Sequence, residues 1–487
     1  MIFEIRAELL ISRTYFTMNE ERDNFREEDI SEALKRFKSS LVSGRAKYFD
    51  VSEFEGIVEQ LMEEGDLQSS EIAAKQGIQI HPNAVPLHLK YAQILLSKGK
   101  YDQAQKYLDF AEKVENTNPD VHLLRGSASL IMGNEAGAKA SFKKAIKAGN
   151  GETDDILYHV GSAFVQIGEI SEAISYFKKA LKLNPKHELA LYDLAFFTDQ
   201  IGDYKHSIKY YNRFIDNDVY NYTAWFNLGI VYNKAEMHDK AIDAYEYTLA
   251  INENFHMALF NIGNALANSG RFKEAIDKYR EFLEFDPDND DAYCYIGECY
   301  LNLDDQLLSE HNYQKAISIN PENDTAHFGV GLIMWIAKKY DRSIDYIKKA
   351  IKIDKQNSEY WLTLGKVSSD AEYLDDAIKA FKKGARVDAE NTEIWLTWAE
   401  TLMNHGDTNG AIRILKKAID NNDDSMLKYR LVAMLLGARK RKEAYEWLRS
   451  AMLQDFENIN YLFDIYPRAL KSKELKKVVD DFRRGDK

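Results

Sequence analysis

The sequence has little proline, little cysteine and no long apolar run. It contains 7 prolines and 2 cysteines among 487 residues. Because proline cannot continue a helix, its scarcity predicts long helices with short connections. No window approaches the ~20 consecutive apolar residues of a membrane-spanning helix. With 45% apolar and 29% charged residues, the composition is that of a soluble, folded protein.

The two cysteines, Cys294 and Cys299, lie five residues apart. On a helix they point in different directions and cannot form a local disulfide. No further ligands lie close by to complete a metal site. The sequence therefore predicts two free thiols in a reducing compartment, and no metal or other cofactor.

The chain also has fewer basic than acidic residues. The chain has 64 basic and 78 acidic residues, a formal net charge of −14. An acidic surface repels nucleic acid and anionic membranes, so both are excluded as partners. A protein or peptide partner of neutral to basic charge is expected instead.

The N-terminus lacks a secretory signal. Charged residues interrupt every apolar stretch of residues 1–18, whereas a signal peptide needs an unbroken apolar run of about 7–15 residues. We therefore expect a cytoplasmic protein. Met18 precedes a strongly polar run and is an alternative start to Met1.

A 34-residue period organises most of the chain. Glycine recurs at Gly229, Gly263, Gly297, Gly331 and Gly365. A second series of small residues runs in step: Ala104, Ala138, Ala173, Ser207, Ala241, Ala275, Ser309, Ser343, Ala377 and Ala411. A third series is bulky: Leu108, Phe142, Phe177, Tyr211, Tyr245, Tyr279, Tyr313, Ile347, Phe381 and Leu415. Small residues let two helices approach closely and bulky ones fill the groove opposite, so each unit is predicted to be a pair of antiparallel helices.

This pattern resembles the tetratricopeptide repeat (TPR) family, as in WFNLGIVY at 225–232 and YCYIGECY at 293–300. The resemblance covers about 51–458, or about 12 units. It implies an all-α fold, a right-handed α-solenoid of helical hairpins with helical caps. We expect an N-terminal extension and capping helix over 1–50, the array over 51–425, and a degenerate repeat with C-terminal capping helices over 426–487.

The resemblance also implies which residues face the groove of the superhelix. Positions 2, 5, 6, 9, 12 and 13 of each unit do so in this family, counting residues 222, 256 and 290 as position 1. Position 5 is held by Tyr158, Tyr192, Phe226, Phe260, Cys294 and Phe328. Aromatic rings there can hold partner side chains. Alternatively, they pack between neighbouring first helices.

Asparagines form a polar stripe in the unit 256–289. Asn261, Asn264 and Asn268 fall at i, i+3 and i+7 on one helix face. Asparagine amides can pair with both polar groups of an extended peptide backbone. Asn227 and Asn261 hold position 6, where related superhelices carry an asparagine ladder that grips peptides. The alternative is a solvated polar face.

Other sites are not supported. The family's clamp for a terminal carboxylate needs a lysine at position 5, where this chain has aromatic residues. Acids at position 2 (Asp155, Asp291, Glu359 and Glu393) favour basic peptides, or only stabilise helix N-termini. No phosphate loop, zinc-protease motif or nucleophile elbow occurs.

The sequence thus predicts a protein-interaction scaffold, not an enzyme. It is expected to bind an extended peptide or a partner protein through Asn227, Asn261, Asn264, Asn268, Tyr192, Phe226, Phe260 and Phe328. The alternative is a non-catalytic targeting subunit of an enzyme assembly, such as a glycosyltransferase-like complex with a separate catalytic chain.

Overall fold

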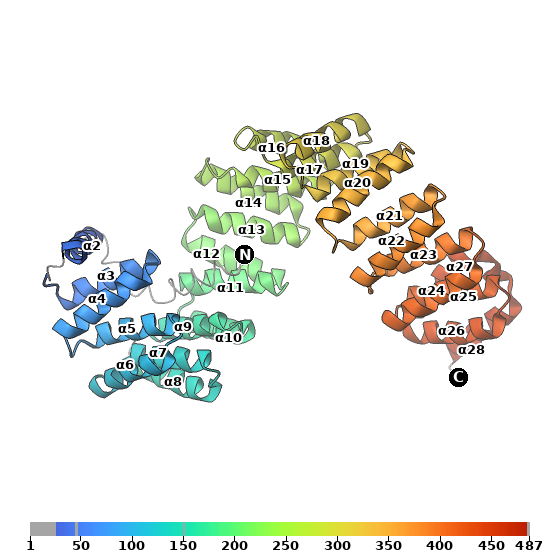
Figure 1. Ribbon diagram of the computed structural model, residues 1–487. Coiled ribbons are helices and arrows are strands. Elements are labelled where there is room, and N and C mark those ends of the chain that lie inside the picture. Colours follow the sequence, from blue (N-terminus) through green and yellow to red (C-terminus); the bar gives the residue numbers. More distant parts are fainter. Residues whose placement is uncertain (1–25, 44–46, 150, 485–487) are drawn as a thin grey trace. The chain divides into compact units, whose positions relative to one another are not determined.

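The computed structural model describes residues 26–43, 47–149 and 151–484 (Figure 1). Over these residues the fold is all-α, with 27 α-helices, one 3₁₀ helix and no strand. This confirms the predicted all-α solenoid. The chain divides into two compact units, unit 1 (Met1–Phe255) and unit 2 (His256–Lys487). The alternative start at Met18 lies outside the described residues.

Unit 1 contains a capping helix followed by six hairpins. Its helices are α2 (Arg26–Ser43), α3 (Val51–Glu63), α4 (Leu67–Ile80), α5 (Val85–Ser97), α6 (Tyr101–Val114), α7 (Pro119–Ile131), α8 (Glu135–Ala148), α9 (Thr153–Gln166), α10 (Ile170–Leu183), α11 (Glu188–Gln200), α12 (Tyr204–Asn217), α13 (Tyr222–Lys234) and α14 (His238–Ile251). Ala33, Leu34 and Phe37 of α2 are buried, as suits the predicted capping helix, whereas Leu41 is exposed.

Unit 2 contains six further hairpins and a C-terminal cap. Its helices are α15 (Met257–Asn268), α16 (Phe272–Leu283), α17 (Asp290–Asn302), α18 (Gln306–Ile319), α19 (Asp324–Ile336), α20 (Tyr340–Ile353), α21 (Ser358–Asp370), α22 (Leu374–Val387), α23 (Thr392–Asn404), α24 (Thr408–Asn421), α25 (Ser425–Gly437), α26 (Arg441–Gln454), α27 (Ile459–Ile465), η2 (Pro467–Lys471) and α28 (Lys473–Arg484). Leu475 and Val479 of α28 are buried, so this helix covers the last hairpin.

The helices within a hairpin meet where a glycine faces a ring. A Cβ atom added to Gly263 would lie 2.5 Å from the Cε1 atom of Tyr279, and one added to Gly229 would lie 2.5 Å from that of Tyr245. Real Cβ contacts are not so short, so each glycine is required by the ring that the same hairpin places against it. Tyr245 and Tyr279 are fully buried. The glycine series and the bulky series of the sequence are therefore two sides of one contact.

Most hairpins begin with a side-chain cap on their first helix, whereas α5, α9 and α15 have none. Asn221, Asn289 and Asn323 accept hydrogen bonds from the backbone N–H groups of Ala224, Ala292 and Ala326, at 3.0, 3.0 and 2.7 Å. Such caps satisfy backbone donors that have no partner within the helix.

The register shifts after α24 because one connection is shorter. Four residues, 388–391, join α22 to α23, but only three, 422–424, join α24 to α25. Ala444 is consequently one residue early in the sequence, yet it is fully buried in α26. Helices α25 and α26 therefore pack as a regular hairpin.

Candidate functional site

The predicted asparagine stripe lies on α15 in unit 2. Asn261 donates from Nδ2 to the carbonyl of Met257 at 2.9 Å, which leaves its side-chain oxygen as an acceptor. Asn264 accepts at Oδ1 from the Tyr279 hydroxyl at 2.7 Å, which leaves its NH₂ group as a donor. Both side chains are half-buried, and Asn268 is exposed at the end of the helix. The two amides thus offer one acceptor and one donor, one helical turn apart.

The predicted aromatic residues pack mainly within the fold. Phe260 contacts the rings of Tyr279, Phe282 and Tyr295, with centroid distances of 5.6, 5.2 and 5.5 Å. Phe328 is only 9% exposed and lies 4.6 Å from the Tyr360 ring. The half-buried ring of Phe260 has an accessible part, whereas the ring of Phe328 has almost none.

Unit 1 brings two of the predicted residues together. Asn227 on α13 donates from Nδ2 to the Tyr192 hydroxyl on α11 at 2.6 Å. Phe226, also on α13, is half-buried and packs on Tyr245 and Phe255. The amide of Asn227 therefore ties two neighbouring hairpins, and only part of its hydrogen-bonding capacity can serve a partner.

An exposed tyrosine that is not among the residues predicted from the sequence lies beside the asparagine stripe. Tyr295 on α17 is 39% exposed and stacks on Tyr279 at a centroid distance of 5.7 Å. Asp291 and Glu298 lie four residues before and three residues after it, on the same helix face. The spacing of Asp291, Tyr295 and Glu298 along one helix would have allowed this surface to be predicted from the sequence.

The carboxyl groups beside Tyr295 lack a basic partner among the ion pairs of the described residues. Removal from water and the neighbouring Asp290 raise the pKa of Asp291. Removal from water and the charge of Glu359 on α21 raise the pKa of Glu298. A positive charge brought here would relieve this repulsion.

Both cysteines are free and buried. Burial raises the pKa of the Cys299 thiol to about 12 and also raises the pKa of the Cys294 thiol. Since the thiolate is the reactive form, neither side chain is suited to act as a nucleophile at neutral pH.

In six repeats a ring N–H group at position 4 joins the first helix to the turn before it. In three repeats this residue is a tryptophan: Trp225, Trp361 and Trp395 donate to the carbonyls of Val219, Lys355 and Ala389 at 2.9, 3.1 and 2.8 Å. In three others it is a histidine: His88, His122 and His327 use Nε2 toward the carbonyls of Pro82, Asn116 and Pro321 at 2.9, 2.9 and 3.0 Å. These histidines are structural. His88 and His122 are 34 residues apart, a spacing that is visible in the sequence.

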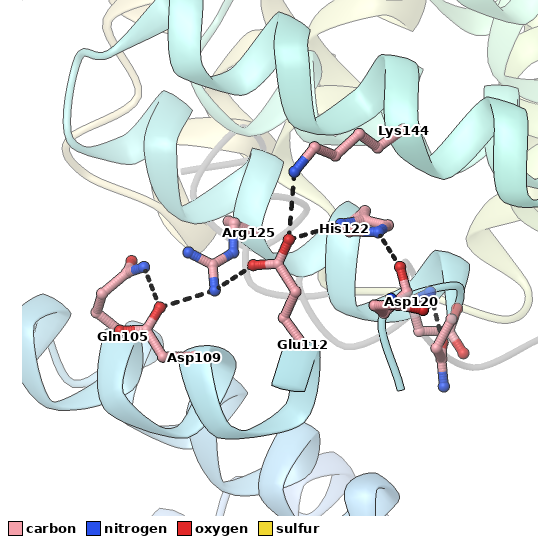
Figure 2. Close-up of polar contacts among 9 residues, drawn as sticks. Gln105, Asp109, Glu112, Asp120, His122, Arg125 and Lys144 are labelled. Atoms are coloured by element: carbon pink, nitrogen blue, oxygen red, sulfur yellow. Dashed lines mark hydrogen bonds and ion pairs between the residues drawn. The ribbon is translucent and has the colours of Figure 1, made fainter. Parts of the chain in front are cut away.

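A charged network connects α6, α7 and α8 in unit 1 (Figure 2). Glu112 pairs with Arg125 at 2.9 Å and with Lys144 at 3.2 Å. Arg125 also pairs with Asp109 at 2.8 Å. Glu112 therefore binds two cations from two different helices. The network fastens neighbouring hairpins together.

Asp154, Asp155 and His187 are the one group in the described residues with the ligand spacing of a metal site. Ala190 donates its backbone N–H to Nδ1 of His187 at 3.3 Å, so the ring carries its proton on Nε2. That atom faces Asp155 at 3.2 Å. The imidazole hydrogen bond holds the pKa of Asp155 below its usual value. A protonated Nε2 is a donor and not a ligand, so the group fits a structural pair between α9 and α11.

In the part of the chain that the structure describes, no helix is both long and apolar enough to cross a membrane.

Comparison with one curated protein gives a partial match. Over 121 residues the chain is 26% identical to the human protein O-mannosyl-transferase TMTC3. This segment is 24% of the chain and spans only 13% of the length of that relative.

Solved structures of low identity also align with the chain. MamA aligns at 24% identity over 33% of this chain and 95% of its own, with a TM-score of 0.32. The APC/C hetero-tetramer Cut9–Hcn1 aligns at 12% identity over 78% of this chain and 96% of its own, with a TM-score of 0.38.

Family models match the repeats directly. A model described as TPR repeat matches residues 263–304. Models described as tetratricopeptide repeat match residues 61–128, 154–187, 222–255, 290–323 and 307–358. These matches lie on the hairpins and follow the period in which Gly229 meets Tyr245 and Gly263 meets Tyr279. The chain therefore belongs to the tetratricopeptide repeat family, with its repeats in a long array.

Proposed function

We propose that the protein is a non-catalytic interaction scaffold and that unit 2 binds an extended segment of a partner along α15 and α17. Repeats of this family generally mediate the binding of protein partners. The observation that carries the more specific proposal is the side-by-side position of two half-buried amides, Asn261 and Asn264, and the exposed ring of Tyr295. The ring contact between Phe260 and Tyr295 joins the two helices at this point.

In this proposal the amides bind the partner's backbone. The free acceptor of Asn261 takes a backbone N–H, and the NH₂ group of Asn264 donates to a backbone carbonyl. The accessible parts of Phe260 and Tyr295 bury apolar side chains. Asn268 extends the polar stripe, whereas Phe328 packs against Tyr360 of α21 and lies outside this surface. In unit 1, Tyr192, Phe226 and Asn227 form a separate contact surface.

The partner's segment is expected to be neutral to basic. Asp291 and Glu298 flank Tyr295, and a lysine or arginine placed over the ring would meet both carboxylates. Such binding weakens as salt is added. We further propose that the protein works in the cytoplasm, where the two buried thiols of unit 2 stay reduced.

The test is a pull-down from native lysate followed by calorimetry with the partner recovered. Asn261→Ala together with Asn264→Ala removes two hydrogen bonds at about 0.5–1.5 kcal/mol each, so affinity is expected to fall by about one to two decades. Because Asn264 accepts from the hydroxyl of the buried Tyr279, the double variant is also expected to melt at a lower temperature, whereas Asn261→Ala alone should change the melting temperature little. Unchanged affinity would show that the partner binds elsewhere.

Asn312→Ala is the matched control. Asn312 on α18 makes the same type of bond as Asn261, from Nδ2 to the carbonyl four residues earlier, at 2.7 Å. Asn312 lies on the second helix of its hairpin, outside the proposed surface of α15 and α17. Asn312→Ala should therefore leave partner binding unchanged. If Asn312→Ala lowers the affinity as much as Asn261→Ala with Asn264→Ala does, the loss of affinity reflects a less stable fold and not a lost contact with the partner.

A second proposal is a non-catalytic targeting subunit of an enzyme assembly with a separate catalytic chain. The observation that favours it is the partial match to an O-mannosyl-transferase. A partner recovered in equal amount that is itself a glycosyltransferase would support this proposal. Recovery of only non-enzymatic proteins would contradict it.

A further inference from the structure

A cavity of about 290 Å³ opens between α20, α21 and α22 in unit 2, the orange helices of Figure 1. It lies between two consecutive hairpins and is formed mainly by their second helices. Its lining residues are Ile344, Lys348, Ile351, Trp361, Leu364, Ser368, Asp376, Lys379, Ala380 and Lys383. None of them belongs to the surface of α15 and α17 proposed above.

Ala380 and Ser368 are smaller than the corresponding residues of the preceding hairpin. Ala380 stands 34 residues after Tyr346, the corresponding residue of that hairpin. Ser368 likewise corresponds to Met334. In the next hairpin Trp398 stands in place of Leu364. The neighbouring grooves therefore have large side chains where this one has space.

The floor of the cavity is apolar and rigid. The Trp361 indole donates to the Lys355 carbonyl at 3.1 Å, which fixes the ring. A Cβ atom added to Gly384 would lie 3.1 Å from the Cβ of Trp361, so the helices are in close contact beneath the ring. Ile344, Ile351 and Leu364 are buried and complete the floor. A site with fixed walls needs little reorganisation on binding.

The rim of the cavity is cationic. Lys348, Lys379 and Lys383 line it with one acid, Asp376, which pairs with Lys379 at 2.9 Å. Lys383 lies over the Trp361 ring, with its Nζ atom 4.7 Å from the ring centroid. The surplus of positive charge contrasts with the net charge of −14 of the whole chain.

We propose that this cavity, the α20–α22 groove, is a second protein-docking site that takes an acidic segment with one large apolar side chain. The apolar side chain enters the space over Ile351 and Trp361, and carboxylates of the segment pair with Lys348, Lys379 and Lys383. Drug-sized ligands occupy pockets of roughly 300–1,000 Å³, so this volume suits a side-chain anchor of a protein segment better than a whole small molecule. Anchors of this kind carry most of the binding energy of many interfaces.

The test uses a fluorescein-labelled peptide with one phenylalanine among glutamates, titrated with the full-length chain by fluorescence anisotropy. Ala380→Tyr places in the groove the residue that the preceding hairpin has at this position, and should weaken binding at least about tenfold. Ser368→Met fills the groove from α21 on the same principle, should Ala380→Tyr disturb folding. Lys379→Glu with Lys383→Glu should weaken binding by a similar factor at low salt.

Three controls separate this site from general attraction and from the surface on α15 and α17. Arg413→Glu with Lys417→Glu changes the same two positions of the next hairpin, where Trp398 replaces Leu364, and should leave binding unchanged. A peptide with lysine at each glutamate should not bind. Asn261→Ala with Asn264→Ala should not affect the acidic peptide, so failure of one proposal is distinguishable from failure of the other.

The proposal is overturned if the wild-type chain does not bind the acidic peptide, or binds the lysine peptide equally well. It is also overturned if both groove-filling variants fold and bind as the wild type does, because the lysines would then attract anions without a docked apolar group. The proposal is likewise overturned if Arg413→Glu with Lys417→Glu weakens peptide binding as much as Lys379→Glu with Lys383→Glu does.

Discussion

The two units differ at the turn inside each hairpin. One residue in the turn between the two helices of every hairpin has a positive φ angle. In unit 1 this residue is glycine in five hairpins (Gly65, Gly99, Gly133, Gly168 and Gly202) and Glu236 in the sixth. In unit 2 it is glycine only at Gly270 and Gly406, and otherwise Asp304, Lys338, Glu372 and Arg439. The same backbone shape is thus built largely with glycine in one unit and mostly without it in the other.

Hydrogen bonds impose this shape whatever the residue. In unit 1, Gly133 and Asn134 donate their N–H groups to the carbonyls of Leu130 and Ser129 at 2.9 and 2.8 Å. In unit 2, Lys338 and Lys339 donate to those of Trp335 and Met334, both at 2.8 Å. This pair of bonds is the Schellman motif, which ends a helix with a left-handed residue. Unit 2 therefore stores strain at its turns that most turns of unit 1 avoid.

The largest expected effect comes from the contact that both units share. Gly263→Leu in unit 2 drives a side chain into Tyr279, and Gly229→Leu in unit 1 drives one into Tyr245. Each should lower the free energy of unfolding by about 1–3 kcal/mol or more. Because hairpins contact mainly their neighbours, hydrogen exchange of Gly263→Leu should rise in α15–α18 before it rises in α21–α24.

The outcome that would contradict this expectation is equal acceleration throughout unit 2, which would indicate one cooperative core. Gly437→Ala serves as a control, since nothing lies within 4 Å of the added Cβ atom. Its exchange pattern should match that of the wild type.

Substitutions at the turns test the difference between the units directly. Lys338→Gly and Glu372→Gly remove side chains from residues with φ angles of 56° and 63°. Each should raise the free energy of unfolding by about 1 kcal/mol. Gly202→Lys in unit 1, where φ is 78°, should lower it by a similar amount. Urea unfolding measures all three. The proposed difference in strain would be wrong if Lys338→Gly and Gly202→Lys both had the same stability as the wild type.

A smaller effect is expected from the ring N–H groups at position 4. Trp395→Phe in unit 2 and Trp225→Phe in unit 1 each remove one hydrogen bond to a turn carbonyl, worth about 0.5–1.5 kcal/mol. Trp395 is buried and Trp225 only half-buried, so the loss should be larger at Trp395. Thermal unfolding of the two variants checks the order. A larger loss at Trp225 would show that burial does not set the cost.

The smallest effects are expected from pH, with opposite signs in the two units. The lowered pKa of Asp155 in unit 1 stabilises the fold above the unfolded value of about 3.9, and this contribution is lost as pH falls through the folded pKa. The raised pKa of Glu298 in unit 2 destabilises the fold at neutral pH, and this cost disappears as pH falls toward about 4.3. At pH 7, Asp155→Asn should lower the stability and Glu298→Gln should raise it.

The difference between Glu298→Gln and wild type should shrink by about pH 4, whereas that of Asp155→Asn should still be present there. Urea unfolding at both pH values measures this. If Glu298→Gln differs from the wild type by the same amount at pH 7 and at pH 4, the raised pKa of Glu298 is not the cause of the difference.

The fold was predictable because its determinants are periodic. A glycine and a ring at fixed places in each 34-residue unit specify one contact, and that contact orients both helices, as Gly263 and Tyr279 show. The candidate surface was predictable only in part. The sequence placed Asn261 and Asn264 on one face, but it could not show that Met257 and Tyr279 occupy half of their hydrogen-bonding groups.

Non-periodic features were harder to predict. The burial of Phe328 depends on Tyr360, a residue of the next hairpin, and the α20–α22 groove depends on Ala380 and Ser368, residues of two helices, being small together. Features that depend on residues of two hairpins cannot be predicted from the sequence pattern of a single repeat. Tyr295 was not predicted because it stands 34 residues after Asn261, where a further asparagine of the ladder was sought.

The asparagine caps make the junctions between hairpins interchangeable. Asn289 and Asn323 stand at the same place in successive units, and each caps the helix that follows it. Excision of residues 290–323 would join Asn289 to Asp324, the residue that Asn323 now precedes, and the new junction would have the same cap and the same following helix. The number of hairpins is therefore a variable that the gene can change in whole steps, so the array can be lengthened or shortened to match the reach of its partners without a new fold.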